Sequence, residues 1–377
     1  MKTFICVNFT NVLMPDIESW EYELLTIISK LPTLIFTGLN KNTGKTTAFN
    51  ALNALFPDEV LGLTSIGYDG EAFDAIYNHP KPPIPVFPGQ LVLTAERFLP
   101  ETKTGYVLLE KWENHPQFGP WLILRITAPG NFRLAGPSTL AELRLGIANL
   151  HRHGATRIHV DGALNRLSPI SLFSSRHPCP GHVRAGFDSQ NPGIILSTGA
   201  ALGDSLQVIV EQSLYILELF DLPTLSHVVA TTNSELNVNV SFQHNAYLLQ
   251  NTWSRLPAYL WCQESLIPLY PEAIYLQGAF TDAFYLALRA KKRLPQKLIV
   301  RSPAHILLSL DSWNDLKSRN ITVLLLERPE LALVTLCPWH PRNPIPTLQL
   351  AEALLPFTKV PLVDVQSRLV WLPTKFE

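Results

Sequence analysis

Residues 34–50 of the chain, LIFTGLNKNTGKTTAFN, place a glycine-flanked polar loop between an apolar strand and the start of a helix. This feature constrains the fold strongly, because a strand, a tight loop and a helix in direct succession are typical of α/β domains. Gly38 and Gly44 enclose five residues, one more than in the usual phosphate-binding loop. Backbone amides at a helix N-terminus attract phosphate oxygens, and glycine lets that backbone approach them closely. The segment therefore predicts a phosphate-binding loop with one additional residue.

The same pattern predicts which loop residues would contact a nucleotide. Lys45 would contact the β- and γ-phosphates, and the Thr46 hydroxyl would bind a magnesium ion. Lys41 is either a second phosphate contact or a solvated side chain. The alternative for the whole segment is a glycine-containing turn with an exposed lysine. The predicted nucleotide-binding residues of the loop are Gly38, Asn40, Lys41, Asn42, Thr43, Gly44, Lys45, Thr46 and Thr47.

Apolar strand-like runs alternate with helical segments along most of the chain. The clearest helix follows GPST, with Pro137 expected just inside its start and Gly154 just past its end. Alternation at this spacing implies right-handed crossovers and a largely parallel sheet. Residues 82–99 are interrupted by prolines, which favours edge strands or a loop around a short strand there. We therefore expect an α/β fold with a doubly wound, mostly parallel sheet of the P-loop NTPase kind, and a second, smaller α/β domain.

The length of the chain and a change in its pattern predict the division into domains. A chain of 377 residues exceeds the usual size of one core, so two domains are expected, with a single large α/β unit as the alternative. The alternation of strands and helices starts again beyond about residue 225, and that second part holds no glycine-rich phosphate loop. We predict an N-terminal helical extension over residues 1–32, a nucleotide-binding domain over residues 33–225 and a C-terminal α/β domain over residues 226–377.

Polar residues follow several of the predicted strands, at the edge where open α/β sheets bind ligands. Asp161 ends an apolar strand and is the predicted catalytic and magnesium-associated carboxylate; the alternative is an aspartate that caps the next segment. Asp69 and Glu71 follow the strand after the loop helix and would orient water or assist magnesium binding, or would only form a glycine turn. Ser138, in AGPST, would donate to a bound anion or only start its helix.

Composition excludes several classes of partner. Charged residues make up 16% of the chain and the net charge is −1, so there is no electrostatic footprint for nucleic acid or an anionic membrane. No stretch reaches the roughly 18 apolar residues that a membrane helix needs, and polar residues interrupt the first 15 residues where a signal peptide would be apolar. Four cysteines without CxxC spacing indicate reduced thiols. We therefore expect a cytoplasmic protein that binds neither nucleic acid nor membrane.

Six motifs that occur in a fixed order carry a resemblance to a known family. The motifs GLNKNTGKTT, GLTSIGYDGE, LTAERFL, LAGPSTLAEL, VDGALNR and ILSTGAALG resemble the P-loop-type subunit of the reactivase for cobalamin-dependent lysine 5,6-aminomutase. Residues 331–365 resemble the closing segment of that family, whereas residues 174–190 and the sequence CPWHP depart from it. The longer loop and the acidic-Gly-Ala turn at Asp161 are also similar to dethiobiotin synthetase, so five intervening residues are a known variant.

The resemblance implies a function and partners. It implies that ATP and Mg²⁺ are the cofactors, with Gly38, Gly44, Lys45 and Thr46 holding the nucleotide and Asp161 on the metal side. It also implies a MutS-like ATPase subunit as partner, and a cobalamin-dependent lysine aminomutase that the pair restores by ATP-dependent release of damaged cofactor. Two alternatives remain: an ATP-dependent small-molecule ligase of the dethiobiotin synthetase type, and an interaction module that does not hydrolyse nucleotide.

Overall fold

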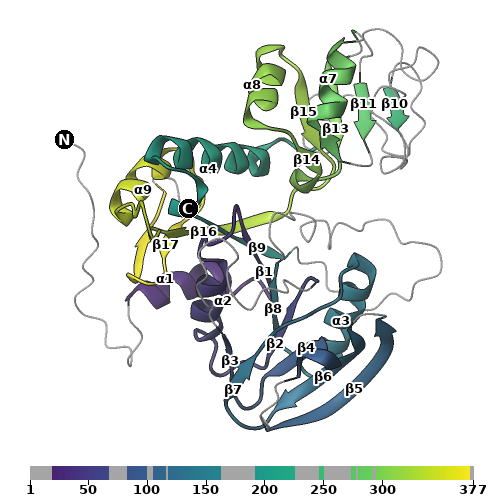
Figure 1. Cartoon of the computed structure of the whole chain (residues 1–377), viewed down its shortest axis with the longest axis vertical. Helices are drawn as coiled ribbons and strands as arrows, with labels where there is room; N and C mark the ends of the chain where they lie inside the picture. The colour runs from purple at the N-terminus through teal and green to yellow at the C-terminus, as the bar shows by residue number, and fades with distance from the viewer. Residues whose placement is uncertain are drawn as a thin grey trace.

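The computed structural model describes residues 19–67, 83–99, 105–115, 118–162, 192–225, 246–249, 273–276, 279–290, 292 and 294–373. Within these residues the chain forms one large sheet, one small sheet of four strands and two sheets of two strands, and helices pack on the first two (Figure 1). The large sheet is mostly parallel, so the mixed α/β architecture expected from the sequence is confirmed. None of the helices in these ranges is long and apolar enough to cross a membrane.

The large sheet has ten strands in the order β18-β17-β16-β9-β1-β8-β2-β4-β6-β5. Its strands are β1 (Thr33–Gly38), β2 (Leu61–Ser65), β4 (Leu91–Ala95), β5 (Tyr106–His115), β6 (Gly119–Ile126), β8 (Arg157–Asp161), β9 (Gly193–Gly199), β16 (Glu330–Cys337), β17 (Leu362–Asp364) and β18 (Leu369–Trp371). From β17 to β4 in this order the strands run parallel to one another, whereas β18 pairs antiparallel with β17 at one edge, and β6 and β5 pair antiparallel at the other. Because β1 lies between β8 and β9, the carboxyl ends of these three strands share one edge of the sheet.

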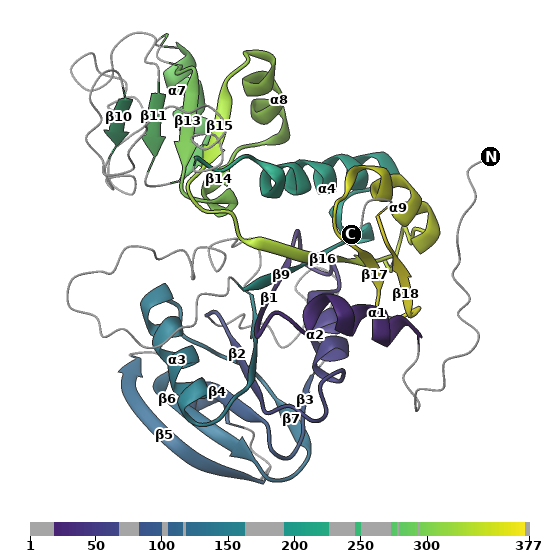
Figure 2. The same ribbon diagram turned by 180° about the vertical axis from the view of Figure 1, so that it is seen from behind.

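Helices cover both faces of the large sheet. On β1, Leu34 and Phe36 pack with α1 (Ser19–Ile28) and α2 (Lys45–Asn53), while Ile35 points to the other face and packs with α3 (Leu140–Arg152). On that second face α4 (Leu206–Asp221) and α9 (Thr347–Leu354) lie side by side near β16 and β17 (Figures 1 and 2). The arrangement is compatible with a doubly wound α/β fold.

The small sheet lies between α4 and β16 in the sequence and at one end of the molecule (Figure 1). It has four parallel strands in the order β10-β11-β13-β15. Its elements are β10 (Ala246–Leu249), β11 (Ala273–Leu276), α7 (Asp282–Ala290), β13 (Lys297–Val300), α8 (Leu310–Ser318) and β15 (Thr322–Leu325). Tyr215 and Leu219 of α4 belong to its core, so α4 packs against both sheets.

Short elements complete the described structure. Two-stranded sheets pair β3 (Ile84–Val86) with β7 (Gly130–Phe132), and β12 (Phe280–Thr281) with β14 (Ile306–Leu307). The 3₁₀ turns are η1 (Glu96–Phe98), η3 (Ala200–Leu202), η4 (Pro303–His305) and η5 (Leu355–Phe357).

The topology differs from the sequence prediction at two places. Strands β16, β17 and β18 belong to the large sheet, since β16 pairs with β9, so the predicted boundary at residue 226 does not separate the two sheets. In residues 82–99, where edge strands or a loop around a short strand are expected, β3 belongs to a two-stranded sheet, whereas β4 lies between β2 and β6 and is not an edge strand. The prolines of this segment all precede β4, so they remove none of its ladder hydrogen bonds. The division of the chain into domains stays a prediction.

Arg157, on β8, fastens the end of α1 to the sheet. Its guanidinium donates to the carbonyl oxygens of Ile28 (3.2 Å), Ser29 (2.9 Å) and Leu31 (2.5 Å), and it also donates to the Glu59 carboxylate (3.0 Å). Only 4% of the Arg157 side chain is exposed. The last carbonyls of a helix have no partner within the helix, so this guanidinium supplies donors to the backbone where α1 ends.

We predict that Arg157→Met lowers the free energy of unfolding by about 3 kcal/mol, because it removes the ion pair with Glu59 and the buried donor to the carbonyl oxygens of Ser29 and Leu31. Urea unfolding followed by circular dichroism measures the change. Lys111→Met is the matched control, since Lys111 is half exposed and pairs with Glu96 at 2.8 Å; it should change stability by less than about 1 kcal/mol. Equal effects of the two substitutions would contradict the role given to Arg157.

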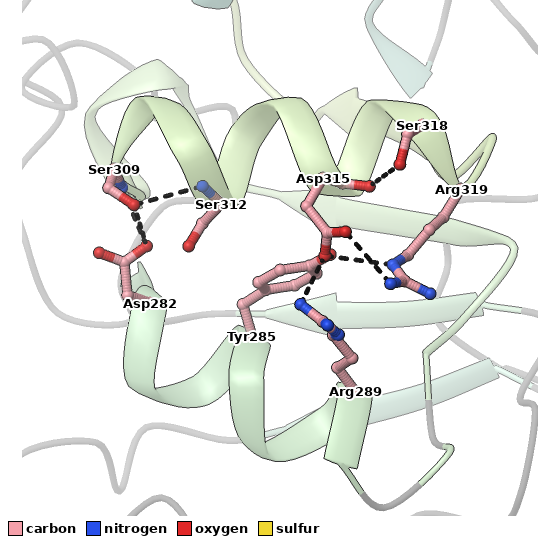
Figure 3. A network of polar contacts seen from close by, with 8 residues as sticks. All are labelled: Asp282, Tyr285, Arg289, Ser309, Ser312, Asp315, Ser318 and Arg319. Atoms are coloured by element: carbon pink, nitrogen blue, oxygen red, sulfur yellow. Dashed lines mark hydrogen bonds and ion pairs between the residues drawn. The ribbon is translucent and has the colours of Figure 1, made fainter.

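Two carboxylates tie the helices α7 and α8 of the small sheet together (Figure 3). At their N-terminal ends, Asp282 accepts hydrogen bonds from the Ser309 backbone N–H (2.9 Å) and hydroxyl (3.0 Å). Ser309 is the N-cap of α8, because its hydroxyl oxygen accepts from the Ser312 N–H. The start of α8 is therefore fixed by α7 as well as by its own cap.

Further along the same helices, Asp315 accepts from three side chains (Figure 3). Arg319 donates at 3.1 and 3.2 Å, Arg289 donates at 3.0 Å, and the Tyr285 hydroxyl donates as well. These hydrogen bonds, from Arg319 first and then Tyr285, lower the pKa of Asp315 to about 2. The ionised form of Asp315 is thus the form that stabilises the fold.

We predict that Asp315→Asn destabilises the protein at neutral pH and that this loss disappears in acid. The folded-state pKa of about 2 lies below the ordinary value near 3.9, so the stabilisation is complete above about pH 4 and is lost as the pH falls toward 2. Urea midpoints of wild type and variant between pH 6 and pH 2.5 test this. The exposed Glu352→Gln should give a small, nearly constant difference, and a constant difference for Asp315→Asn would contradict the prediction.

Candidate functional site

The loop between β1 and α2 is folded onto itself and onto the end of β9. The Thr43 hydroxyl donates to the Asn40 carbonyl oxygen at 2.9 Å, and the Lys41 N–H donates to the Asn40 side-chain oxygen at 2.8 Å. The Asn40 side-chain amide donates to the carbonyl oxygen of Ala201, in the turn after β9, at 3.2 Å. The Leu39 N–H donates to the Ser197 carbonyl oxygen at 3.0 Å. The loop therefore has a defined shape set by its own polar groups.

Close packing explains the two glycines that flank the loop. A Cβ on Gly38 would lie 2.6 Å from the Thr43 hydroxyl oxygen. Gly44 has φ +82°, in the left-handed region, and a Cβ there would lie 2.9 Å from the Cβ of Cys337. Residues with a side chain would thus disturb the loop at both positions. Cys337, at the end of β16, packs against Gly44 of the loop. No local motif in the sequence indicates this contact.

Lys45 and Asp161 meet at the carboxyl edge of the large sheet. Lys45 is the first residue of α2, and its Nζ donates to Asp161 Oδ1 and to the Gly162 carbonyl oxygen, both at 2.5 Å. The side chains of Lys45 and Asp161 are 12% and 17% exposed. The Gly162 N–H donates to the Phe36 carbonyl oxygen, so the turn after β8 closes against β1. The structure thus brings together two residues that the sequence assigned to one site.

The end of β2 and the start of α3 lie beside Asp161. The Ile66 N–H donates to the Asp161 carbonyl oxygen at 3.0 Å, and the Gly67 N–H donates to the Pro137 carbonyl oxygen at 2.9 Å. The Gly136 N–H donates to the Ser65 hydroxyl oxygen at 2.9 Å. These hydrogen bonds make the ends of β8 and β2 and the segment before α3 one continuous edge.

The start of α3 differs from the sequence expectation. Pro137 precedes the helix, and the N-cap is Thr139, whose hydroxyl oxygen accepts from the Glu142 N–H (3.3 Å) and whose hydroxyl donates to the Glu142 carboxylate (2.7 Å). The spacing T-x-x-E is a capping-box signal that could have identified Thr139 from the sequence. Ser138 is exposed, and its contact with an anion stays a prediction. Gly154, with φ +100°, ends the helix as expected.

The other predicted residues are placed as follows. Thr46 and Thr47 lie in the first turn of α2 and are half-buried. Asn42 adopts a left-handed backbone conformation with φ +63° within the loop. Asp69 and Glu71 lie outside the described residues, so their catalytic role stays a prediction.

A buried histidine lies beneath α2. His159 Nδ1 is 2.6 Å from the Asn53 side-chain oxygen, and the rings of Phe36, Phe49 and Phe56 surround the imidazole with centroid distances of 5.5, 6.4 and 5.7 Å. His159 Nε2 and Asn53 Nδ2 have no hydrogen-bond partner among the described residues. The environment therefore disfavours the charged imidazolium.

We predict that His159 makes the protein less stable in mild acid. Burial, and then the charge of Arg157, lower the pKa of His159 to about 3, whereas the unfolded chain binds this proton near pH 6.5. Stability is therefore complete above about pH 6.5 and falls as the pH decreases toward 3. His159→Phe should reduce the loss of unfolding free energy between pH 7 and pH 5 by up to about 2 kcal/mol. Urea unfolding at both pH values measures it, and the exposed His151→Asn should leave the loss unchanged.

The donor set at the carboxyl edge suits magnesium. Among the described residues no group of three or more His, Cys, Asp or Glu side chains could hold a metal ion. Magnesium, however, usually takes only one or two carboxylates together with phosphate oxygens and water. The Asp161 carboxylate and the Thr46 hydroxyl are oxygen groups of this kind; Asp161 contacts Lys45, and Thr46 is the next residue of α2.

Comparisons of the chain with protein-family models, with curated proteins and with solved structures find no match.

Proposed function

We propose that the chain binds ATP and Mg²⁺ at residues 38–47 and is the nucleotide-binding subunit of a reactivating factor for a cobalamin-dependent lysine aminomutase. The meeting of Lys45 with Asp161, at the end of the neighbouring parallel strand, is the observation that carries the nucleotide-binding part. A cation from the loop and a carboxylate from the next strand are the two charges that a magnesium–nucleotide complex requires. The reactivase part depends on the ordered motifs and on the closing segment at residues 331–365.

Each residue of the site has a part in this proposal. The loop backbone from Gly38 to Thr47 would surround the phosphates, and Lys45 would neutralise their charge. The Thr46 hydroxyl and the Asp161 carboxylate would bind magnesium. Hydrolysis of ATP would cleave the phosphoanhydride bond between its β- and γ-phosphates and release the γ-phosphate. Asp69 and Glu71 would position the attacking water.

The contacts of α4 support a transmission of the nucleotide state to the small sheet. The helix starts close to the loop, because the Asn40 side chain binds Ala201 in the turn that precedes it. In its C-terminal half, the Tyr215 hydroxyl donates to the Leu308 carbonyl oxygen at 2.8 Å, and Glu218 accepts from Trp313 at 3.1 Å. The turn before α4 therefore contacts the loop, and the C-terminal half of α4 contacts the small sheet.

A change of this kind has a known energetic requirement. To move an arrangement of the two sheets from 1:99 to 99:1, a ligand must bind one state about 5.5 kcal/mol more tightly than the other. Contacts to the γ-phosphate that form in only one state would supply this difference. The proposed partners are a MutS-like ATPase subunit and the aminomutase. The arrangement of the two sheets that ATP favours would open the aminomutase, so that damaged cofactor leaves.

We predict that Lys45→Ala weakens MgATP binding at least about tenfold, because a charge-assisted contact to phosphate is lost. Isothermal titration calorimetry measures the affinity, and Lys111→Ala, a half-exposed lysine at the sheet edge, should bind like wild type. In a reactivation assay with the partner subunit, Lys45→Ala should fail to restore inactivated aminomutase. Restoration at the normal rate would contradict the reactivase role. ATP turnover by the isolated chain that a small acid stimulates would indicate the ligase alternative instead.

A further inference from the structure

We infer that the segment after β16, residues 338–345, forms a base subsite beside the phosphate loop, with the ring of Trp339 as a stacking platform for a purine base. It rests on the proposed nucleotide binding and adds the recognition of the end of the ligand opposite to its terminal phosphate. Trp339 belongs to the sequence CPWHP, where the chain departs from the family that it resembles.

The segment starts beside the phosphate loop. Cys337, the last residue of β16, is in register with Gly199 at the end of β9. A Cβ on Gly44 of the loop would lie 2.9 Å from the Cβ of Cys337 and 3.2 Å from its Sγ, so these two residues are packed together. Trp339 follows Cys337 by two residues. The chain therefore leaves β16 at the carboxyl edge of the large sheet, against the loop that would hold the phosphates.

The order of the strands indicates where a base would lie. In the large sheet, β8 lies on one side of β1, whereas β9 and then β16 lie on the other side (Figure 2). Lys45 contacts Asp161 at the end of β8, so the β- and γ-phosphates belong on the β8 side of the loop. The base is at the opposite end of a nucleotide, and it would extend from the loop over the ends of β9 and β16.

Trp339 is the side chain in this place that suits a base. Residues 199–205 follow β9 and residues 338–345 follow β16, and in these two segments Trp339 is the large apolar side chain that is strongly exposed, by 47%. The turn after β9 offers Ala200, Ala201 and Leu202, which have no aromatic ring. An indole combines a broad face with only two side-chain torsions, so it offers stacking area at a low cost in conformational entropy.

The backbone around Trp339 is held in place. The Ile345 N–H donates to the Pro338 carbonyl oxygen at 3.0 Å and closes the segment into a loop. Within this loop, His340 Nδ1 accepts from two backbone N–H groups at 3.2 and 3.0 Å. Three prolines restrict the backbone further, and Ile345 packs against the core that α4, α9 and β16 share. Because the loop is ordered by its own contacts, binding of a base does not have to order it.

Stacking determines which ligands the subsite accepts. Every base has a π-face, and a purine covers more of an indole ring than a pyrimidine does. A stacked face does not read the donors and acceptors at the edge of the base, so it does not separate adenine from guanine. The expected ligand class is therefore purine nucleoside triphosphates, with ATP among them.

Isothermal titration calorimetry of the full chain with the magnesium complexes of ATP and of inorganic tripolyphosphate tests this inference, because tripolyphosphate has the phosphates without a base. Trp339→Ala should weaken ATP binding about tenfold, as expected for the loss of one stack, and should change tripolyphosphate binding by less than about twofold. Trp339→Phe keeps an aromatic face and should stay within about threefold of wild type for ATP. Phe357→Ala removes another exposed aromatic ring, in η5, and should bind ATP like wild type.

The magnesium complex of UTP, which has a smaller base, provides a second comparison. Wild type should bind it more weakly than the ATP complex, and Trp339→Ala should reduce that difference. An undiminished preference for ATP in Trp339→Ala would contradict stacking on this ring. Circular dichroism and urea unfolding check the fold of each variant.

The outcomes separate the base subsite from the proposed function. Unchanged ATP binding by Trp339→Ala would overturn the subsite, and failure of that variant in the reactivation assay would then assign Trp339 to a protein contact. Equal weakening of ATP and tripolyphosphate binding would also overturn it, since Trp339 would then only shape the loop. Both results leave phosphate binding intact, whereas a wild type that binds neither ATP nor tripolyphosphate would overturn the proposed function itself.

Discussion

The parallel pairing of β1 with both β8 and β9 is the constraint on which the rest of the site depends. Residues of β1 are buried along the whole strand, so its position in the sheet is fixed by packing on both faces. Because all three strands run in the same direction, their following segments emerge at one edge. The loop, the turn at Asp161 and the turn at Ala201 meet there, and Asn40 and Lys45 join them by hydrogen bonds.

The loop obtains its shape from this position and from close neighbours. The Gly44 backbone has the left-handed conformation, and the space where its side chain would be is filled by Cys337 of β16. Cys337 also contacts Gly199 at the end of β9, where a Cβ would lie 2.0 Å from the Cys337 carbonyl oxygen. A strand that is 293 residues later than Gly44 in the chain thus completes the packing beneath the loop.

Local patterns predicted what depends on neighbours in the sequence. The strand before the loop, the helix that ends at Gly154 and the strand that ends at Asp161 all follow from apolar runs with glycine after them. The convergence of Lys45 and Asp161 was also predictable, since both residues follow parallel strands. Contacts between segments that are distant in the sequence could not be predicted in this way. The sequence of β16 would suit any buried parallel strand, so nothing local indicates that it pairs with β9 rather than with the small sheet. The Arg157 contacts with the α1 carbonyls are equally invisible, because backbone acceptors leave no trace in the sequence.

The chain enters and leaves the small sheet at a single place. The Leu325 N–H donates to the Pro223 carbonyl oxygen at 2.9 Å, and Thr224 forms a parallel bridge with Leu325. The segment that leads into the small sheet and the segment that leads out of it are therefore joined by backbone hydrogen bonds. A short linker between residues 223 and 325 would close the large sheet without stretching it, and among the described residues the face of α4 that carries Tyr215 and Leu219 would lose its cover. In evolutionary terms, the small sheet has the attachment of a module that can be gained or exchanged while the order of the large sheet is preserved.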